Sequence, residues 1–305
     1  MPSTTFHPAN GRVFVAAVIP AKPQPRSATA VAWRMATFTA TLMATLTAMA
    51  PLSAAAIEPT ASDPAKIMAA VEGRDTGDKM VARMQMTITD AGGSQRQRVV
   101  QTRSMKFAGG RKQLMIFESP ADVRNTALLS TDWDDGAKDD DQWLYLPSLH
   151  KSTRISGADK SGAFMGSDFS YADMTTKDPK DYEYVLSKPS VMVGGEDCWL
   201  IEARPKTAKE KSETGYVKTM VWVSKKRLLP LQTKIWVAEG RKIKLIRSEQ
   251  IKLVDGIWVP HRMSVRTVRG KEVLSTTVLD FLTLKLGDST VKDGDFSQRR
   301  LEQGL

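Results

Sequence analysis

Histidine is the side chain best suited to general acid–base chemistry near neutral pH, and two histidines, His150 and His261, lie beyond residue 56. A serine-hydrolase triad would require one of them beside an acid and an activated serine. His261 shares strand parity with Val259 and Met263, a pattern typical of a half-buried histidine in a sheet. Because neither histidine has a visible positioned partner, we expect no catalytic residue and no enzyme activity.

A run of carboxylates offers a second kind of chemistry, the binding of a cation. Its members are Asp132, Asp134, Asp135, Asp139, Asp140 and Asp141. Closely spaced oxygens are the ligands that calcium prefers, but the EF-hand spacing and its terminal glutamate are absent. Runs of like charge usually lie in water. We therefore expect a solvated loop with no resident metal or cofactor, and a bound cation is the alternative.

Large apolar side chains give a stronger signal than these polar groups. An aromatic strand around Trp143 and Tyr145 runs into Pro147, and the glycine-punctuated segment 161–174 follows. That segment is too apolar for a free loop, so its side chains must dock on another surface. It predicts a lid over a ligand cavity, since lids come from elements of low stability. A loop packed permanently over one end of the sheet is the alternative.

The candidate residues for the cavity and its lid share large, apolar or aromatic side chains. They are Met84, Met86, Phe117, Trp143, Tyr145, Phe164, Met165, Phe169, Tyr171 and Trp222. Methionine favours adaptable apolar surfaces, and barrel mouths are common places for apolar ligand sites. Strand alternation also allows each of these residues to be ordinary core, which is the alternative interpretation.

Two neighbouring motifs carry a family resemblance. WLYLPSLHKSTRIS at residues 143–156 and FMGSDFSYADM at residues 164–174 resemble the LolA-like outer-membrane lipoprotein-sorting proteins, and the resemblance extends from about Asp63 to Phe296. It implies a curved antiparallel sheet, an unclosed half-barrel wrapped over helices or a lid, with a hydrophobic cavity for acyl chains. It also implies a periplasmic carrier that works with an inner-membrane transporter or an acceptor protein.

The N-terminal residues 1–56 have the composition of a cleavable export signal. Arg34 precedes the uncharged segment Met35–Ala50, Pro51 ends it, and small residues follow. We expect cleavage after Ala56 or Ala55, and a periplasmic protein of one domain over residues 57–305. Residues 1–30 do not belong to the pattern of an export signal, which favours a translation start near Val31. No cysteine stands at the end of the signal segment to accept a lipid, so we do not expect a lipoprotein.

Charge and cysteine content narrow the function classes. The chain carries 44 basic and 34 acidic residues, and removal of residues 1–56 leaves 40 and 34, a net charge of +6. The charges are interleaved, so we expect no nucleic-acid binding, although transient attraction to anionic membrane surfaces is reasonable. Lys242 and Lys244 occupy alternate strand positions, which favours the solvent face of a sheet. The single cysteine, Cys198, excludes an intramolecular disulfide.

The elements that position these residues are one helix and a long antiparallel meander. Asp63-Pro64 is a helix-start signal, with apolar residues at 67, 68 and 71 and a stop at Gly73. Alternating residues from Met80 to Ile88 and recurrent glycine turns predict about nine to eleven strands, which is too many for a flat sheet.

The sequence as a whole predicts a non-enzymatic chaperone of the cell envelope. It would bind lipid or lipoprotein acyl chains by burial, since each methylene removed from water contributes about 0.8 kcal/mol. No phosphate-binding G-x-x-x-x-G-K-[ST] loop is present, so release would require a partner. An envelope interaction or structural module without a ligand is the first alternative, and a lipid or glycan hydrolase is the weaker one.

Overall fold

The computed structural model of the chain describes residues 58, 60–136 and 138–302. The expected export signal, the start near Val31 and the cleavage sites at Ala55 and Ala56 lie outside these residues. Within the described part, every helix is too short or too polar to cross a lipid bilayer.

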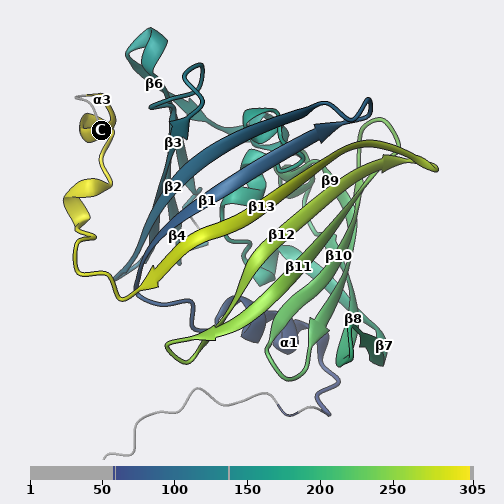
Figure 1. Cartoon of the computed structure of the whole chain (residues 1–305). Helices are drawn as coiled ribbons and strands as arrows, with labels where there is room; N and C mark the ends of the chain where they lie inside the picture. The colour runs from purple at the N-terminus through teal and green to yellow at the C-terminus, as the bar shows by residue number, and fades with distance from the viewer. Residues whose placement is uncertain (1–57, 59, 137, 303–305) are drawn as a thin grey trace, which may run out of the picture. The chain divides into compact units, whose positions relative to one another are not determined.

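The described residues form an antiparallel sheet of thirteen strands that does not close into a barrel (Figure 1). The strands are β1 (Lys79–Asp90), β2 (Gln95–Phe107), β3 (Gly110–Ser119), β4 (Ala127–Trp133), β5 (Asp141–Leu146), β6 (Lys151–Ile155), β7 (Tyr182–Val193), β8 (Glu196–Pro205), β9 (Tyr216–Ser224), β10 (Leu229–Val237), β11 (Lys242–Val254), β12 (Ile257–Arg269) and β13 (Glu272–Leu286). The predicted fold class is confirmed, but the structure has more strands than the nine to eleven expected. Short strands explain the difference, since β6 carries no apolar alternation that a sequence could show.

The order of the strands decides what the connecting segments must do. Two meanders, β1–β6 and β7–β13, are joined side by side through β1 and β13, so β6 and β7 are the two free edges. These edge strands are consecutive in the chain. The segment that joins them, residues 156–181, must therefore pass from one edge of the sheet to the other. We call it the lid segment, and Figure 1 shows its turns behind the curved sheet.

Helices and short 3-10 turns complete the architecture. They are α1 (Pro64–Glu72), α2 (Ala208–Thr214), α3 (Gln298–Glu302), η1 (Pro147–Leu149), η2 (Gly157–Ser161), η3 (Phe164–Gly166), η4 (Tyr171–Met174), η5 (Pro179–Asp181) and η6 (Asp293–Asp295). The predicted N-terminal helix is confirmed as α1. The Asp63 carboxylate accepts hydrogen bonds from the backbone of Ala65 and Lys66, and Pro64 occupies the first turn. Gly73 is its C-cap.

The sheet buries apolar side chains on both faces. Cross-strand register places Met84, Val100 and Phe117 on one face, which the lid segment covers and which we call the inner face. Helix α1 packs on the same face of β8 and β9, against Trp199 and Val221. The opposite, outer face is covered over β2–β6 by the C-terminal segment, residues 288–302.

Candidate functional site

The lid segment fills the inner face with aromatic rings. Phe164 and Phe169 have relative exposures of 0% and 3%. The Phe164 ring lies 5.8 Å from Phe117 of β3 and meets Tyr171 edge-on at 5.7 Å between centroids. The backbone turns sharply between the two phenylalanines, because Met165 has φ 51° and Gly166 has φ 70°. That turn brings both rings down onto the sheet.

These rings belong to the inner cluster, an apolar core rich in methionine. Its members include Met84, Met86, Val100, Met115, Phe117, Phe164, Phe169, Val265 and Leu279, with Met165, Tyr171, Met174 and Met263 packed against it. Methionine has an unbranched, polarizable side chain that adapts to different neighbours. The inner face is therefore lined by side chains that can repack around another apolar group.

The ten sequence-predicted site residues divide between the two faces. Seven gather in the inner cluster: Met84, Met86, Phe117, Phe164, Met165, Phe169 and Tyr171. Trp143 and Tyr145 instead lie on the outer face with Leu129 and Phe296, beneath the C-terminal segment. Trp222 packs on the outer face beside Cys198 and Leu231. A site on the inner face therefore brings together the seven and not the other three.

A buried carboxylate fastens the lid segment to the sheet. Asp168 is 6% exposed and accepts hydrogen bonds from the hydroxyls of Thr267, Ser275 and Thr277, at 2.7 Å for Thr277. Its backbone N–H donates to the Thr277 hydroxyl at 2.9 Å. Because these hydroxyls come from β12 and β13, Asp168 ties the lid to the middle of the sheet. Charge-assisted hydrogen bonds of this kind are about twice as strong as neutral ones.

A second polar contact holds the lid to β9 and β11. The Tyr216 hydroxyl donates to the Asp173 carboxylate at 2.7 Å, and the Lys244 ammonium lies 3.5 Å from it. Lys177 is 3.7 Å away. Burial opposes ionisation of Asp173, but these lysines and hydrogen bonds hold its pKa below the ordinary value. Asp173 also accepts a hydrogen bond from the backbone of Ser170, which closes the capping box of η4.

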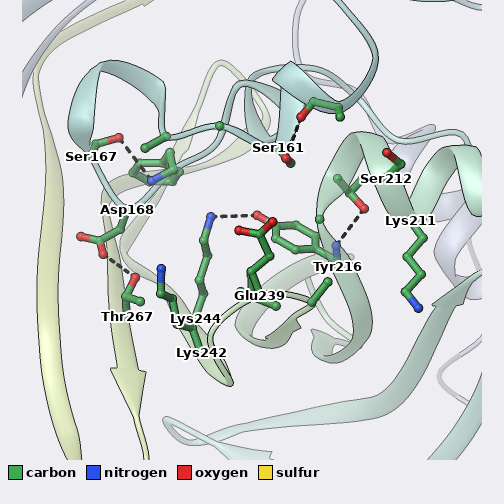
Figure 2. A pocket seen from close by; sticks show the side chains of 18 of the residues that line it. Ser161, Ser167, Asp168, Lys211, Ser212, Tyr216, Glu239, Lys242, Lys244 and Thr267 are labelled. Atoms are coloured by element: carbon green, nitrogen blue, oxygen red, sulfur yellow. Dashed lines mark hydrogen bonds between the residues drawn. The ribbon is translucent and has the colours of Figure 1, made fainter.

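A cavity of about 540 Å³ opens beside these polar contacts (Figure 2). Its walls come from the lid segment, α2, the β10–β11 turn and the inner face of β11–β13. Among its lining residues are Asp168, Phe169, Lys211, Tyr216, Glu239, Lys242, Lys244 and Thr267. Of the predicted site residues, Phe169 lines it. The inner cluster itself is filled by side chains, and the cavity beside it is lined by charged, polar and apolar residues.

The solvent-face prediction is wrong for Lys244, whereas Lys242 is exposed. Both line the cavity, and only 13% of the Lys244 side chain is exposed. The register pairs Lys244 with Thr267, whose hydroxyl faces Asp168 on the inner side. At this end of β11 the inner face borders the cavity, where Lys244 lies beside the Asp173 carboxylate. Burial lowers the pKa of Lys244, and Asp173 counteracts that effect.

The acidic loop is engaged by donors from the protein. Asp140 accepts from the backbone of Trp133 at 3.0 Å, and Arg154 pairs with Asp141 at 2.6 Å. Asp132 accepts from the backbone and hydroxyl of Thr176, both at 3.1 Å. Burial, with Asp140 nearby, raises the pKa of Asp132 to about 7. In the described part of the chain, no three His, Cys, Asp or Glu side chains are arranged to hold a metal ion.

The two histidines lie apart from the cavity. His150 is exposed after η1, and His261 is half-buried with its Nδ1 3.1 Å from the carbonyl oxygen of Val259. The residues that sequence reasoning missed are Asp168 and Lys244. A usable signal existed for Asp168, because this acid directly precedes Phe169 in a motif whose aromatic side chains were expected to dock. Thr267, Ser275 and Thr277 supply its counterpart, since they replace apolar residues at inward positions of two strands.

Comparison with known proteins adds the following relatives. A family model described as an uncharacterized protein matches residues 109–303. A crystal structure of a candidate outer membrane lipoprotein-sorting protein domain from Vibrio parahaemolyticus is 30% identical, with a TM-score of 0.70, over 78% of this chain and 98% of that one. A DUF1329 family protein from Desulfovibrio piger is 32% identical, with a TM-score of 0.70, over 78% and 97%.

A more distant structure shares the fold. A LolA superfamily protein from Nitrosomonas europaea is 21% identical with a TM-score of 0.59, and the match covers 78% of this chain and 99% of that one. No curated protein matches the chain.

Proposed function

Because the chain belongs to the LolA-like family of outer-membrane lipoprotein-sorting domain proteins, which includes the DUF1329 proteins, we propose that it is a non-enzymatic carrier of acyl chains in the periplasm. Residues 1–56 would export it, and residues 57–305 would form its single binding domain. The cargo is a lipid or the lipid part of a lipoprotein. Delivery within the envelope would use an inner-membrane transporter or an acceptor protein.

One observation supports this proposal above the others: the lid segment inserts Phe164 and Phe169 into the methionine-rich inner cluster. An acyl chain offers the same apolar surface as those rings, at about 0.8 kcal/mol for each methylene buried. It could therefore replace them with little net loss of burial. Met84, Met86 and Met115 would then repack around the chain.

The topology also allows the lid segment to move without disturbing the sheet. Its backbone bridge joins Ala163 to Ser170, both within the segment, and its ends leave from the free edges of β6 and β7. The ladder hydrogen bonds of the thirteen strands do not pass through it. Opening of the lid would be a local event, which proteins sample at lower free energy than global unfolding.

Hydrogen exchange with a bound ligand tests this function. Lipids that co-purify with the protein would be extracted and identified by mass spectrometry, and a fluorescent fatty acid would be titrated into the delipidated protein. We expect the lid segment to exchange faster than residues 217–223 of β9, and its protection to change when the fatty acid binds. Absence of any bound acyl chain in both measurements would refute the carrier.

The tight packing of the lid favours a second candidate, an envelope interaction module without a ligand. Phe164 is fully buried and Asp168 is fully hydrogen-bonded, as in a loop that never opens. This candidate predicts that the lid exchanges as slowly as β9. The exchange experiment therefore separates the two functions.

A further inference from the structure

The inner face changes from apolar to polar along each of the strands β11, β12 and β13. On β11, β12 and β13 the inner cluster is formed by Ile246, Val265 and Leu279. One or two inward positions further along, these strands present Lys244, Thr267 and Ser275 to the cavity. Phe169 marks the boundary, because it belongs to the inner cluster and also lines the cavity. A ligand lying across that boundary would have an apolar part and a polar part.

The lysine side chains at the cavity outnumber the carboxylates that pair with them. Lys244 shares Asp173 with Lys177, so two ammonium groups face one carboxylate. Lys211 and Lys242 are exposed at the cavity and take part in no ion pair within the described residues. Only 13% of the Lys244 side chain is exposed, so its charge is poorly solvated and burial lowers its pKa. An anion in the cavity would interact favourably with all three lining lysines.

Two carboxylates also line the cavity, and they differ in availability. The Asp168 carboxylate is occupied by three hydroxyl donors, so it is held against the sheet. Glu239 lies on the exposed β10–β11 turn, and Figure 2 shows its side chain among the cavity lining. A bound anion would be repelled by Glu239, and this side chain can swing toward solvent because it is exposed. Removing the charge of Glu239 should therefore strengthen anion binding, whereas removing the charge of a lining lysine should weaken it.

We propose that this cavity binds the phosphate-bearing head group of an anionic amphiphile while its acyl chain replaces the lid rings in the inner cluster. The inference rests on the carrier function proposed above and adds the head-group chemistry of the cargo. A volume of about 540 Å³ is sufficient for a phosphoglycerol group. Lys211, Lys242 and Lys244 contact the phosphate, and the place that Phe169 leaves is where the head group meets the acyl chain. An uncharged acylated peptide would leave these lysines without a counterion.

The test compares three probes that share parts of one molecule. They are 1-oleoylglycerol, 1-oleoylglycerol 3-phosphate and glycerol 3-phosphate, titrated calorimetrically into the delipidated protein below the micelle concentrations of the lipids. We expect the phosphorylated lipid to bind about tenfold more tightly than the neutral one, as one charge-assisted contact allows. This preference should shrink as ionic strength rises, because salt screens partly exposed charges.

Substitutions test which side chains cause the preference for the phosphorylated lipid over the neutral one. Lys211→Gln with Lys242→Gln should reduce it, with Lys244 still in place, and should weaken binding of the phosphorylated lipid more than binding of the neutral lipid, since both side chains are exposed and outside the inner cluster. Glu239→Gln should increase the preference. Lys252→Gln is the matched control, because Lys252 is exposed on the same strand outside the cavity. It should change nothing.

The remaining outcomes separate this inference from the carrier function. Equal binding of the two lipids by the wild-type protein would overturn the head-group site and leave the carrier intact. Binding of neither lipid would overturn both. If glycerol 3-phosphate bound as tightly as the phosphorylated lipid, the cavity would be a site for soluble phosphate esters, and the lipid assignment would be wrong.

Discussion

Two irregular segments lie across the sheet, and they are fastened in different ways. The lid segment covers the inner face with Phe164 and Phe169, and the C-terminal segment covers the outer face of β2–β6 with Phe296 and Leu301. Both bury apolar side chains almost completely. Their polar contacts differ, because the lid segment is held by the buried carboxylates of Asp168 and Asp173, whereas the C-terminal segment forms ion pairs that are partly or largely exposed.

The C-terminal segment is held by ion pairs at the surface. Lys112 pairs with Asp293 at 2.6 Å, and 69% of the Asp293 side chain is exposed. Arg103 pairs with Asp295 at 3.3 Å. Exposed pairs contribute little and place few demands on geometry, whereas a buried carboxylate such as Asp168 must meet its donors to avoid a large desolvation cost. The hydrogen bonds of Asp168 therefore fix the position of the lid segment, whereas the ion pairs of the C-terminal segment constrain its position less.

The largest expected effect comes from removing the lid rings. Phe164→Ala with Phe169→Ala deletes two buried rings, and a Phe→Ala change in a rigid core costs about 3–5 kcal/mol. If the lid is a replaceable cover, its segment detaches without unravelling the sheet. The rings would then no longer compete with the acyl chain for the inner cluster. Acyl-chain affinity should therefore rise while the free energy of unfolding falls. Fatty-acid titration and urea denaturation measure the two quantities.

Phe296→Ala is the matched control on the outer face. It should destabilise the protein and leave fatty-acid affinity unchanged, because Phe296 lies on the opposite side of the sheet. If the lid double variant unfolds cooperatively while its folded fraction binds normally, the lid rings are ordinary core and the comparison fails.

The next effect compares the two kinds of polar contact. Asp168→Ala removes the acceptor of three hydroxyls and should cost on the order of 3 kcal/mol of unfolding free energy. Asp293→Ala should cost at most about 1 kcal/mol, and high salt should reduce even that. Urea denaturation at two ionic strengths gives both values. Equal losses for the two variants would show that burial does not distinguish the contacts.

Asp132 makes the stability of the folded protein dependent on pH. Its carboxyl accepts from Thr176 at the end of the lid segment, and its pKa is raised to about 7, chiefly by burial. The folded protein keeps this group protonated where the unfolded chain has lost the proton. The contribution of protonated Asp132 to the free energy of unfolding is thus complete below about pH 4. It declines as pH rises and is lost above about pH 7.

Asp132→Asn removes this titration. We expect the stability of the variant relative to wild type to increase from pH 4 to pH 7 and then to level off. Urea denaturation of both proteins across that range measures the difference. A difference that does not vary with pH would mean that Asp132 titrates at its ordinary value.

The smallest effect is expected at Cys198, on the outer face away from both segments. Burial raises the pKa of its thiol to about 11, so it stays protonated and unreactive. Cys198→Ala should cost on the order of 1 kcal/mol and leave fatty-acid binding unchanged. Loss of binding with the fold intact would indicate a thiol function and a coupling between the two faces.

Short-range sequence patterns predicted helix α1 and the docking of the lid segment. The N-cap at Asp63 and the apolar positions 67, 68 and 71 identified α1, because helix capping and helical periodicity are short-range properties. The apolar character of the lid motif predicted that it must dock, and it does. The ligand role of these residues stays a prediction.

Long-range pairing explains what the sequence could not predict. The partners of Asp168 lie about a hundred residues further along the chain, on β12 and β13. Trp143 and Tyr145 lie close to the lid in sequence, but they face the C-terminal segment. No local pattern distinguishes an aromatic residue that faces the lid from one that faces the C-terminal segment.

The sequence by itself determined which residues share a face of each strand, because side-chain alternation is a property of the extended backbone. It also determined the family, through one motif that contains β6 and a second motif in the lid segment. Only the tertiary structure decided which face lies inside the curve, since that depends on the register of thirteen strands and on the segments that cover them. The same register turned Lys244 from an expected surface residue into part of a cavity wall.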